Sequence, residues 1–226
     1  MSTRGGEMAY KGYAGYVDDT VGRVPRMDPI LSKEIAARVA RHFGIPIEDA
    51  RVVTNNHLRR FANHGNIERV QKGVYCHIEP TVFGKASPDV DALTSHILMF
   101  ERKHIIGYET GASLLNRLGL TTLMPRKTEI ATNSYTMKLP KGSLVVKRKP
   151  VVLVNNENWR YLQFIDAVHD LQRLAPAHNE NNPILKTYAE KHKLDFGRLI
   201  AIAVKHYSRK LAWTLTCLLV ANEPAQ

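Results

Sequence analysis

The sequence predicts an α+β protein made of two units: a helical N-terminal unit closed by a β-hairpin, and a larger α+β unit that ends in helices. Two observations predict this class. Apolar residues recur every three or four positions over several long stretches, as in amphipathic helices. Between them lie short runs rich in β-branched residues, bounded by glycine or proline, as expected for strands. With 226 residues, 44% of them hydrophobic and 23% charged, the chain can form one large domain or two small ones.

The first expected helix follows an N-terminal segment that has no regular pattern. Residues 1–27 combine glycines with scattered tyrosines, so we expect a flexible arm there. A helix is expected from Asp28, as the N-cap, to the residue before Gly44, with Pro29 in the first helical position. Its apolar stripe repeats at every fourth residue: Leu31, Ile35, Val39 and Phe43.

A second helix is expected over residues 54–64, followed by a hairpin. Its apolar face includes Leu58, and Gly65 can adopt the left-handed conformation after its last turn. The fragments NIERV and VYCHI then predict two strands joined by a tight turn over residues 71–73. Helix, glycine and basic-tipped hairpin is the order of a winged helix-turn-helix. We therefore expect such a domain over residues 28–80.

The positive charge is concentrated in two stretches. The formal net charge is +11 and the pI is about 9.7, and polyanions are the usual partners of strongly basic proteins. Residues 51–77 hold five Lys and Arg against one Glu, and residues 126–150 hold seven against one. Either stretch alone could be an ordinary solvated surface, but two concentrated patches favour binding to a polyanion.

The outer face of the 54–64 helix is chemically suited to reading DNA. Asn and Arg side chains match the edges of adenine and guanine, and a helix fits the major groove. The run 147–149 is expected either as a second contact to the DNA backbone or as a solvated edge strand. The alternative for the helix is that the hairpin is structural and the arginines simply face solvent. The residues expected to contact double-stranded DNA are Arg51, Asn55, Asn56, His57, Arg59, Arg60, Arg69, Lys72, Lys147, Arg148 and Lys149.

The second half of the chain is expected to combine strands with a helical end. One helix should begin at the Ser-Pro-Asp sequence over 87–89 and run to about residue 100, and a short one should cover 110–118. Three strand candidates follow: EIAT, SLVVKRK and PVVLV. Further helices are expected over 158–174, 183–192, 195–207 and 208–222, with a polar loop over 176–183.

Two stretches resemble the AbiEi family, which comprises antitoxins of abortive-infection toxin–antitoxin systems and related transcriptional regulators. They are NHLRRFANHGNIERVQKGVY and GYETGASLLNRLGLTTLMPRKTEIATN, and the resemblance covers about residues 55–175. It implies a winged helix joined to a larger C-terminal domain, repression of the protein's own operon through promoter repeats, and indirect (type IV) antagonism of a nucleotidyltransferase-like toxin encoded beside it. The chain departs from the family in its glycine-rich arm and in residues 45–51. That stretch is short for the helix before the recognition helix, so either it is a single turn or the boundaries lie a few residues away.

The expected organisation is therefore a flexible arm over 1–27, a winged helix over 28–80 and an α+β antitoxin domain over 81–226. Two alternatives to a DNA-binding antitoxin remain open at this point. One is a protein-interaction module that neutralises a toxin by binding it directly, with the winged helix as scaffold. The other is a stand-alone transcriptional regulator.

The residues show no catalytic constellation. The chain has no Walker A loop, dinucleotide-binding fingerprint, nucleophile-elbow serine or Cys-x-x-Cys pair. His169 and Asp170 are adjacent, as in metal phosphohydrolases, but the accompanying ligands are missing, and Asp170 is expected to be solvated. Cys76 and Cys217 are too few for a zinc cluster. We therefore expect no enzymatic activity, metal or cofactor.

The same residues favour a cytoplasmic protein without a membrane partner. The longest apolar run, residues 211–221, is too short to cross a bilayer. Two thiols without a recognisable signal peptide suggest a reducing compartment.

Overall fold

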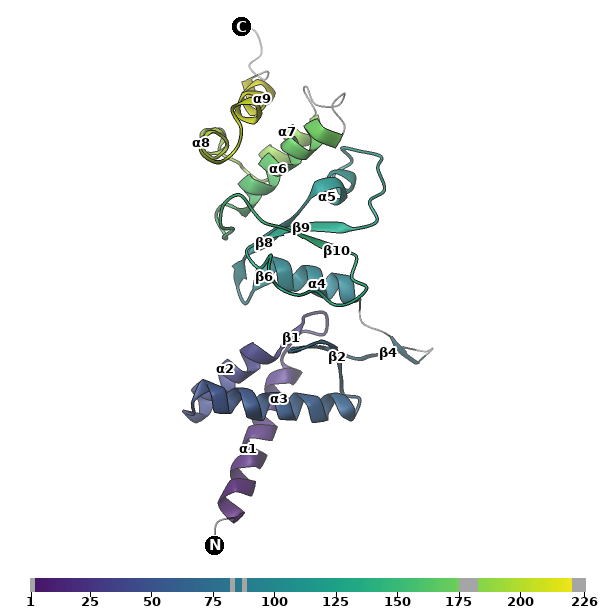
Figure 1. Cartoon of the computed structure of the whole chain (residues 1–226), viewed down its shortest axis with the longest axis vertical. Coiled ribbons are helices and arrows are strands. Elements are labelled where there is room, and N and C mark those ends of the chain that lie inside the picture. Colours follow the sequence, from purple (N-terminus) through teal and green to yellow (C-terminus); the bar gives the residue numbers. More distant parts are fainter. Residues whose placement is uncertain (1–2, 82–83, 87–88, 175–182, 221–226) are drawn as a thin grey trace. The chain divides into compact units, whose positions relative to one another are not determined.

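The computed structural model describes residues 3–81, 84–86, 89–174 and 183–220 (Figure 1). It is a mixed α+β structure, as predicted. The chain divides into two compact units, Met1–His96 and Ile97–Gln226, which are called the N-terminal and C-terminal units below. The division lies further along the chain than the expected boundary between residues 80 and 81.

The N-terminal unit packs helices against a small antiparallel sheet. Its described helices are α1 (Thr3–Gly22), α2 (Ser32–Phe43) and α3 (Ile47–Asn63). Its described strands are β1 (Ile30–Leu31), β2 (Ile67–Gln71), β3 (Val74–His77), β4 (Glu79–Thr81) and β5 (Gly84–Ala86). The first three strands form a sheet in the order β1-β3-β2, and β4 pairs with β5.

Helix α1 belongs to the core of this unit. Val17 and Val21 are 0% and 1% exposed, and they pack in one cluster with apolar residues of α2 and α3. The ring of Tyr13 meets the ring of Phe43 edge-on, with centroids 4.5 Å apart. The expectation of a flexible arm over residues 1–27 is therefore wrong for this helix. Its glycines weaken the helix locally, but α2 and α3 offer a surface on which its apolar side chains are buried.

Helices α2 and α3 differ from expectation at their starts. The expected N-cap Asp28 precedes β1, and α2 begins at Ser32, because β3 offers the residues before it a partner strand. The end of α2 at Gly44, with a φ of 63°, agrees with the prediction. Helix α3 begins at Ile47, so the stretch 45–51 contains the start of this helix and forms no separate one.

The C-terminal unit is built around a three-stranded sheet in the order β10-β9-β8, in which β8 and β9 are antiparallel and β9 and β10 are parallel. The strands of this unit are β6 (Phe100–Glu101), β7 (His104–Ile105), β8 (Gly107–Thr110), β9 (Thr128–Thr132) and β10 (Val145–Arg148). Its helices are α5 (Gly111–Arg117), α6 (Trp159–Leu174), α7 (Pro183–Lys191), α8 (Phe196–His206) and α9 (Arg209–Val220). Helix α4 (Val90–Met99) spans the division between the units.

Helices cover both faces of this sheet (Figure 1). On one face Ile130 packs with Leu98, at the end of α4. The next residue, Ala131, points to the other face and packs with Tyr108 and with Leu162 of α6. This alternation along β9 is the two-residue period of a strand that is buried on both sides.

The expected strands are confirmed in part. EIAT lies within β9 and SLVVKRK contains β10, whereas PVVLV over residues 150–154 forms no strand. Val151 and Leu153 are 51% and 75% exposed, because this segment leaves the sheet before α6 begins. Strand β8 was not predicted, since its four residues Gly-Tyr-Glu-Thr carry little β signal of their own.

The expected helices of the second half are confirmed by α4 to α9, including two predicted N-caps. Asp195 accepts a hydrogen bond from the Arg198 amide at 2.6 Å, and Ser208 accepts one from the Leu211 amide at 3.2 Å. The residues 87–88 and most of the predicted loop 176–183 lie outside the described residues. None of the helices in the described ranges is long and apolar enough to cross a membrane.

Candidate nucleic-acid interface

Helix α3 presents a polar face to solvent. Because successive residues turn by about 100° around a helix, Asn55, Asn56, Arg59, Arg60 and Asn63 fall within an arc of about 140°. All five are exposed. Within the described part of the chain, Arg59 forms no ion pair. Two arginines and three asparagines therefore share one exposed surface.

The opposite face of α3 anchors this surface. Ala50, Thr54 and Leu58 are each 0% exposed, and Ala50 and Leu58 belong to the apolar cluster that also holds residues of α1 and α2. Gly65 follows the helix with a φ of 74°, which lets the chain turn directly into β2. The apolar pattern of the helix thus decides which side chains face solvent.

The β2–β3 hairpin adds two further exposed basic residues. Lys72 lies in its turn and Arg69 lies on β2, opposite Tyr75 of β3. Gly73 adopts a φ of 79° in this turn, as predicted. Its carbonyl accepts a hydrogen bond from the Ser32 amide at 2.9 Å, which ties the turn to the start of α2.

Two of the residues expected to contact DNA already have acidic partners within the N-terminal unit. His57 Nε2 lies 2.7 Å from Asp18 Oδ1 of α1, and its side chain is only 14% exposed. Arg51 pairs with Glu48, one turn earlier, at 2.8 Å. Glu48 and Asp49 suit the positive end of the helix dipole, but their charge repels phosphate. The basic part of the α3 surface is therefore its second half, beyond the first two turns.

The second basic stretch is not a uniform basic surface. Arg148 Nη1 donates to Asp170 Oδ2 at 2.9 Å, and its Nη2 donates to Asp170 Oδ1 at 3.1 Å. Its Nε also lies 3.2 Å from Glu129 Oε1, and the Asp170 side chain is 0% exposed. The expectation that Arg148 contacts DNA phosphate is thus corrected: it is the internal partner of a buried carboxylate.

Its two neighbours remain closer to the surface. The Lys147 amino group donates to the Met137 carbonyl and is half-buried. Lys149 is exposed, with its amino group 5.4 Å from the centre of the Tyr135 ring. Of the three residues in this run, Lys149 alone keeps the exposure that a phosphate contact needs.

A second buried aspartate completes the network. Asp166 is 4% exposed, and it accepts hydrogen bonds from the hydroxyls of Tyr108 at 2.8 Å and Tyr207 at 2.7 Å. Burial raises the pKa of Asp166, although both hydroxyl contacts oppose the shift. Burial and the nearby Asp166 charge also raise the pKa of Tyr108, so this phenol stays a hydrogen-bond donor.

Asp170 shows the opposite behaviour one helical turn later. Burial alone would raise its pKa, but the hydrogen bonds and positive charge of Arg148 outweigh burial and hold the pKa below the ordinary value of 3.8. The same contacts raise the pKa of Arg148. The expectation that Asp170 is solvated is therefore wrong. The sequence signal for this network is a pair of aspartates four residues apart on the apolar face of α6.

The net charge is divided unequally between the units. The N-terminal unit contains 13 Lys and Arg against 11 Asp and Glu, a net of +2, whereas the C-terminal unit contains 19 against 10, a net of +9. The basic surface of α3 and the hairpin is therefore a local feature of a nearly neutral unit. Attraction of DNA to the N-terminal unit would depend on these few residues.

Metal-binding and thiol chemistry find little support in the described ranges. In this part of the chain no group of three or more His, Cys, Asp or Glu side chains is arranged to hold a metal ion. Cys76 is buried, and burial followed by the nearby Glu68 charge raises the pKa of its thiol. Cys217 is exposed.

No protein-family model matches this chain, and a search of curated proteins finds no match. Function is therefore inferred from the chain's own residues and geometry, together with the resemblance described above.

Proposed function

We propose that the N-terminal unit is a winged helix-turn-helix domain that binds double-stranded DNA. The order of its elements carries this proposal: α1, β1, α2, α3 and the β2–β3 hairpin, with the sheet order β1-β3-β2. In such domains the second helix of the pair enters the major groove while the hairpin lies beside the sugar-phosphate backbone. Here that helix is α3, and its exposed face carries the asparagines and arginines.

Each exposed residue has a role in this proposal. Asn55 and Asn56 read base edges, since an amide can pair in two places with adenine. Arg59 and Arg60 contact guanine or the adjoining phosphates. The two basic residues of the hairpin hold flanking phosphates and fix the register of the helix in the groove.

We propose further that the protein represses its own operon and serves as the antitoxin of a type IV toxin–antitoxin pair, counteracting a nucleotidyltransferase-like toxin. Support comes from the AbiEi resemblance, whose second stretch forms β8, α5 and β9 of the C-terminal unit. Two glycines of that stretch are required by the fold: a Cβ at Gly107 would lie 2.4 Å from the Leu98 carbonyl oxygen, and Gly111 adopts a φ of 70°, which other residues rarely adopt. The proposal assigns no catalytic role to the chain.

A gel-shift titration on the DNA upstream of the protein's own reading frame tests the DNA-binding proposal. Arg59→Ala/Arg60→Ala should weaken binding and lower the slope of log affinity against log salt by about one for each phosphate that the variant no longer neutralises. If about six to ten phosphates are neutralised, wild-type affinity should fall by about 10³ to 10⁵ between about 50 and 200 mM salt.

Arg23→Ala/Arg26→Ala is the matched control, because it removes the same charge from exposed positions of the same unit outside α3. Binding that is equal in the α3 variant and the wild type would remove α3 from the interface. Asn55→Ala should instead relax the sequence preference at one base pair, which a panel of operator variants would show.

Co-expression with the product of the neighbouring reading frame tests the antitoxin role. Rescue of growth without co-purification of the two proteins supports indirect antagonism. Co-purification would instead favour a module that neutralises the toxin by direct binding. Repression without any toxic neighbour would leave a stand-alone regulator.

A further inference from the structure

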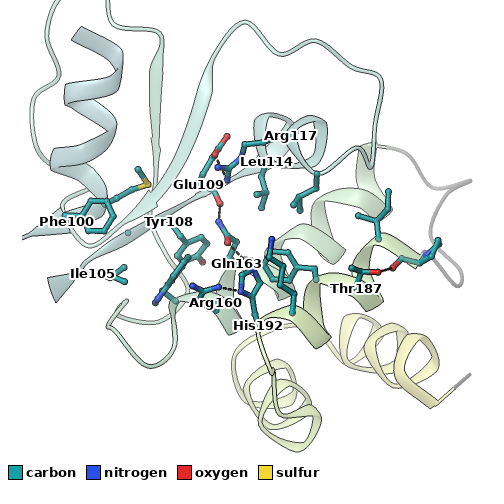
Figure 2. A pocket seen from close by; sticks show the side chains of 18 residues that line it. Phe100, Ile105, Tyr108, Glu109, Leu114, Arg117, Arg160, Gln163, Thr187 and His192 are labelled. Atoms are coloured by element: carbon teal, nitrogen blue, oxygen red, sulfur yellow. Dashed lines mark hydrogen bonds and ion pairs between the residues drawn. The ribbon is translucent and has the colours of Figure 1, made fainter. Parts of the chain in front are cut away.

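The C-terminal unit contains a cavity that the DNA-binding proposal does not use. Its volume is about 700 Å³, within the range of about 300 to 1,000 Å³ that is typical of sites for small organic ligands. It lies among β8, α5, α6 and α7, with the end of α4 at one side (Figure 2). All of its lining residues belong to the C-terminal unit, between Met99 and His192.

One part of the lining is apolar and aromatic. Ile105, Leu114, Leu118 and Ile184 supply aliphatic surface, and rings come from Phe100, Tyr108, Trp159 and Tyr188. Such a lining favours a flat, largely apolar group, because aromatic side chains gain additional energy from offset or edge contacts with another ring. Figure 2 shows Phe100, Ile105 and Tyr108 on one side of the space and Leu114 above it.

The other part of the lining is cationic. Arg117, Arg160 and Lys191 line the cavity, and among its described lining residues Glu109 is the sole carboxylate. Glu109 is already paired with Arg117, at 2.7 Å. Within the described ranges neither Arg160 nor Lys191 forms an ion pair, so their charges have no carboxylate partner.

Arg160 is held in place for an anion. Its guanidinium lies 4.6 Å from the centre of the Trp159 ring and contacts His192 Nδ1 (Figure 2). An arginine fixed by an aromatic face and a histidine keeps further N–H donors for a ligand, because its planar group carries five. The rotamer entropy lost on binding is therefore reduced in advance.

Hydrogen bonds across the cavity wall fix its shape. Gln163 donates to the Glu109 carbonyl at 2.9 Å and accepts from the Tyr188 hydroxyl at 2.6 Å. Burial raises the pKa of Tyr188 to about 12, while the charges of Arg160 and Arg117 oppose the shift. The phenol therefore remains protonated, and the wall that joins β8, α6 and α7 is preformed.

We propose that this cavity binds a mononucleotide. Its base would lie among the apolar and aromatic side chains, and its phosphate would accept hydrogen bonds from Arg160 and Lys191. A mononucleotide combines the flat ring and the negative charge that the two parts of the lining favour, and its size suits the volume. The inference goes beyond the DNA-binding proposal and does not depend on it.

The chain provides its own reporter for this site. It has two tryptophans, of which Trp159 lines the cavity and Trp213 on α9 is 70% exposed. In the Trp213→Phe variant, indole fluorescence therefore comes from the cavity alone. Titration with AMP, GMP, CMP and UMP, each followed by calorimetry, should give saturable binding for at least one of them. Adenosine, ribose 5-phosphate and inorganic phosphate should bind at least about tenfold more weakly than the best nucleotide, since each lacks one half of the recognition.

Two arginine variants in the same Trp213→Phe background test the assigned contact. Arg160→Gln should weaken nucleotide binding by about tenfold or more, which is typical of losing a charge-assisted hydrogen bond. Arg198→Gln is the matched control, because Arg198 also lies over an aromatic ring, that of Tyr161 at 4.7 Å, but does not line the cavity. Its binding should stay within about twofold of the parent. Circular dichroism checks that each variant is folded, and Lys191→Gln, at the end of α7, replaces Arg160→Gln if that variant does not fold.

Three results would each overturn the proposal: no saturable binding of any of the four nucleotides, equal binding of the free nucleoside, or equal loss in both arginine variants. Because the readout involves no DNA, failure here leaves the DNA-binding proposal standing, and failure of the gel shift leaves this one standing.

Discussion

Arg59 and Arg148 both belong to basic stretches of the sequence, yet the first lies at the surface of the N-terminal unit and the second closes a buried network in the C-terminal unit. The difference comes from the carboxylates that each fold brings within reach. Helix α3 buries apolar residues and a threonine on its inner face, and among the described residues Arg59 forms no ion pair. Strand β10 runs beside α6, whose inner face carries Asp166 and Asp170.

The comparison shows that a run of basic residues does not define a surface by itself. Lys147, Arg148 and Lys149 are consecutive, but they face a backbone carbonyl, a buried aspartate and solvent, respectively. Neighbouring side chains of a strand point to opposite faces, so Lys147 and Arg148, the last two residues of β10, cannot act as one patch. On α3, in contrast, residues one turn apart share a face, and the charge accumulates there.

Among the variants considered, Asp170→Asn should lower the stability of the C-terminal unit most. Without its carboxylate the half-buried Arg148 loses its main partner, and the free energy of unfolding should fall by about 3 kcal/mol. Asp166→Asn should cost less than about 1 kcal/mol, since an amide still pairs with the two tyrosine hydroxyls and a buried charge is removed. Urea unfolding followed by tryptophan fluorescence measures both, because Trp159 and Trp213 lie in this unit. If the two variants lose equal free energy of unfolding, the pairing of Arg148 with Asp170 is not the main source of stability in this network.

The two aspartates should also respond oppositely to pH. Asp170 has a folded pKa below 3.8, so its stabilisation is present above that value and is lost as the pH falls through the lower folded pKa. Asp166 has a raised pKa, so its contribution is largest in acid and is lost as the pH rises through the folded pKa. The acid limb of the stability profile should therefore flatten in Asp170→Asn. It should persist in Asp166→Asn.

Val17→Ala should have a smaller effect, confined to the N-terminal unit. Val17 is 0% exposed in α1, and removing two buried methyl groups should cost about 2 kcal/mol. Hydrogen exchange resolved by segment should show faster exchange in α1, α2 and α3. Val52→Ala is the control, because Val52 is 60% exposed on α3 and its truncation should leave stability nearly unchanged. If hydrogen exchange in these helices is unchanged in Val17→Ala, α1 does not contribute to the core of the N-terminal unit.

Lys149→Gln should have the smallest effect on stability, and its effect on DNA affinity tests whether the C-terminal unit also contacts DNA. Lys149 is exposed, so stability should change by less than about 0.5 kcal/mol. If DNA contacts the α3 surface alone, gel-shift affinity should stay within about twofold of the wild type, while Arg59→Gln weakens it clearly. Comparable losses of affinity in the two variants would instead show a second backbone contact at this strand end.

Much of the secondary structure was predictable from the sequence because its signals are local. The ends of α2 and α3 follow from Gly44 and Gly65, which can adopt positive φ, and the N-cap of α8 follows from Asp195. The exposed face of α3 follows from the period of its apolar residues. These features depend on neighbours within about one or two helical turns, which the sequence places in order.

Tertiary structure decided the features that depend on distant partners. Helix α1 is stable because two other helices bury Val17 and Val21, and β1 forms because β3 lies beside it. Arg148 is half-buried and paired because Asp170, 22 residues further along the chain, lies within hydrogen-bond distance. The cavity in the C-terminal unit likewise combines residues from seven separate elements, α4, β6, β7, β8, α5, α6 and α7. Sequence periodicity reports which face of an element is buried, but only packing decides what that face meets.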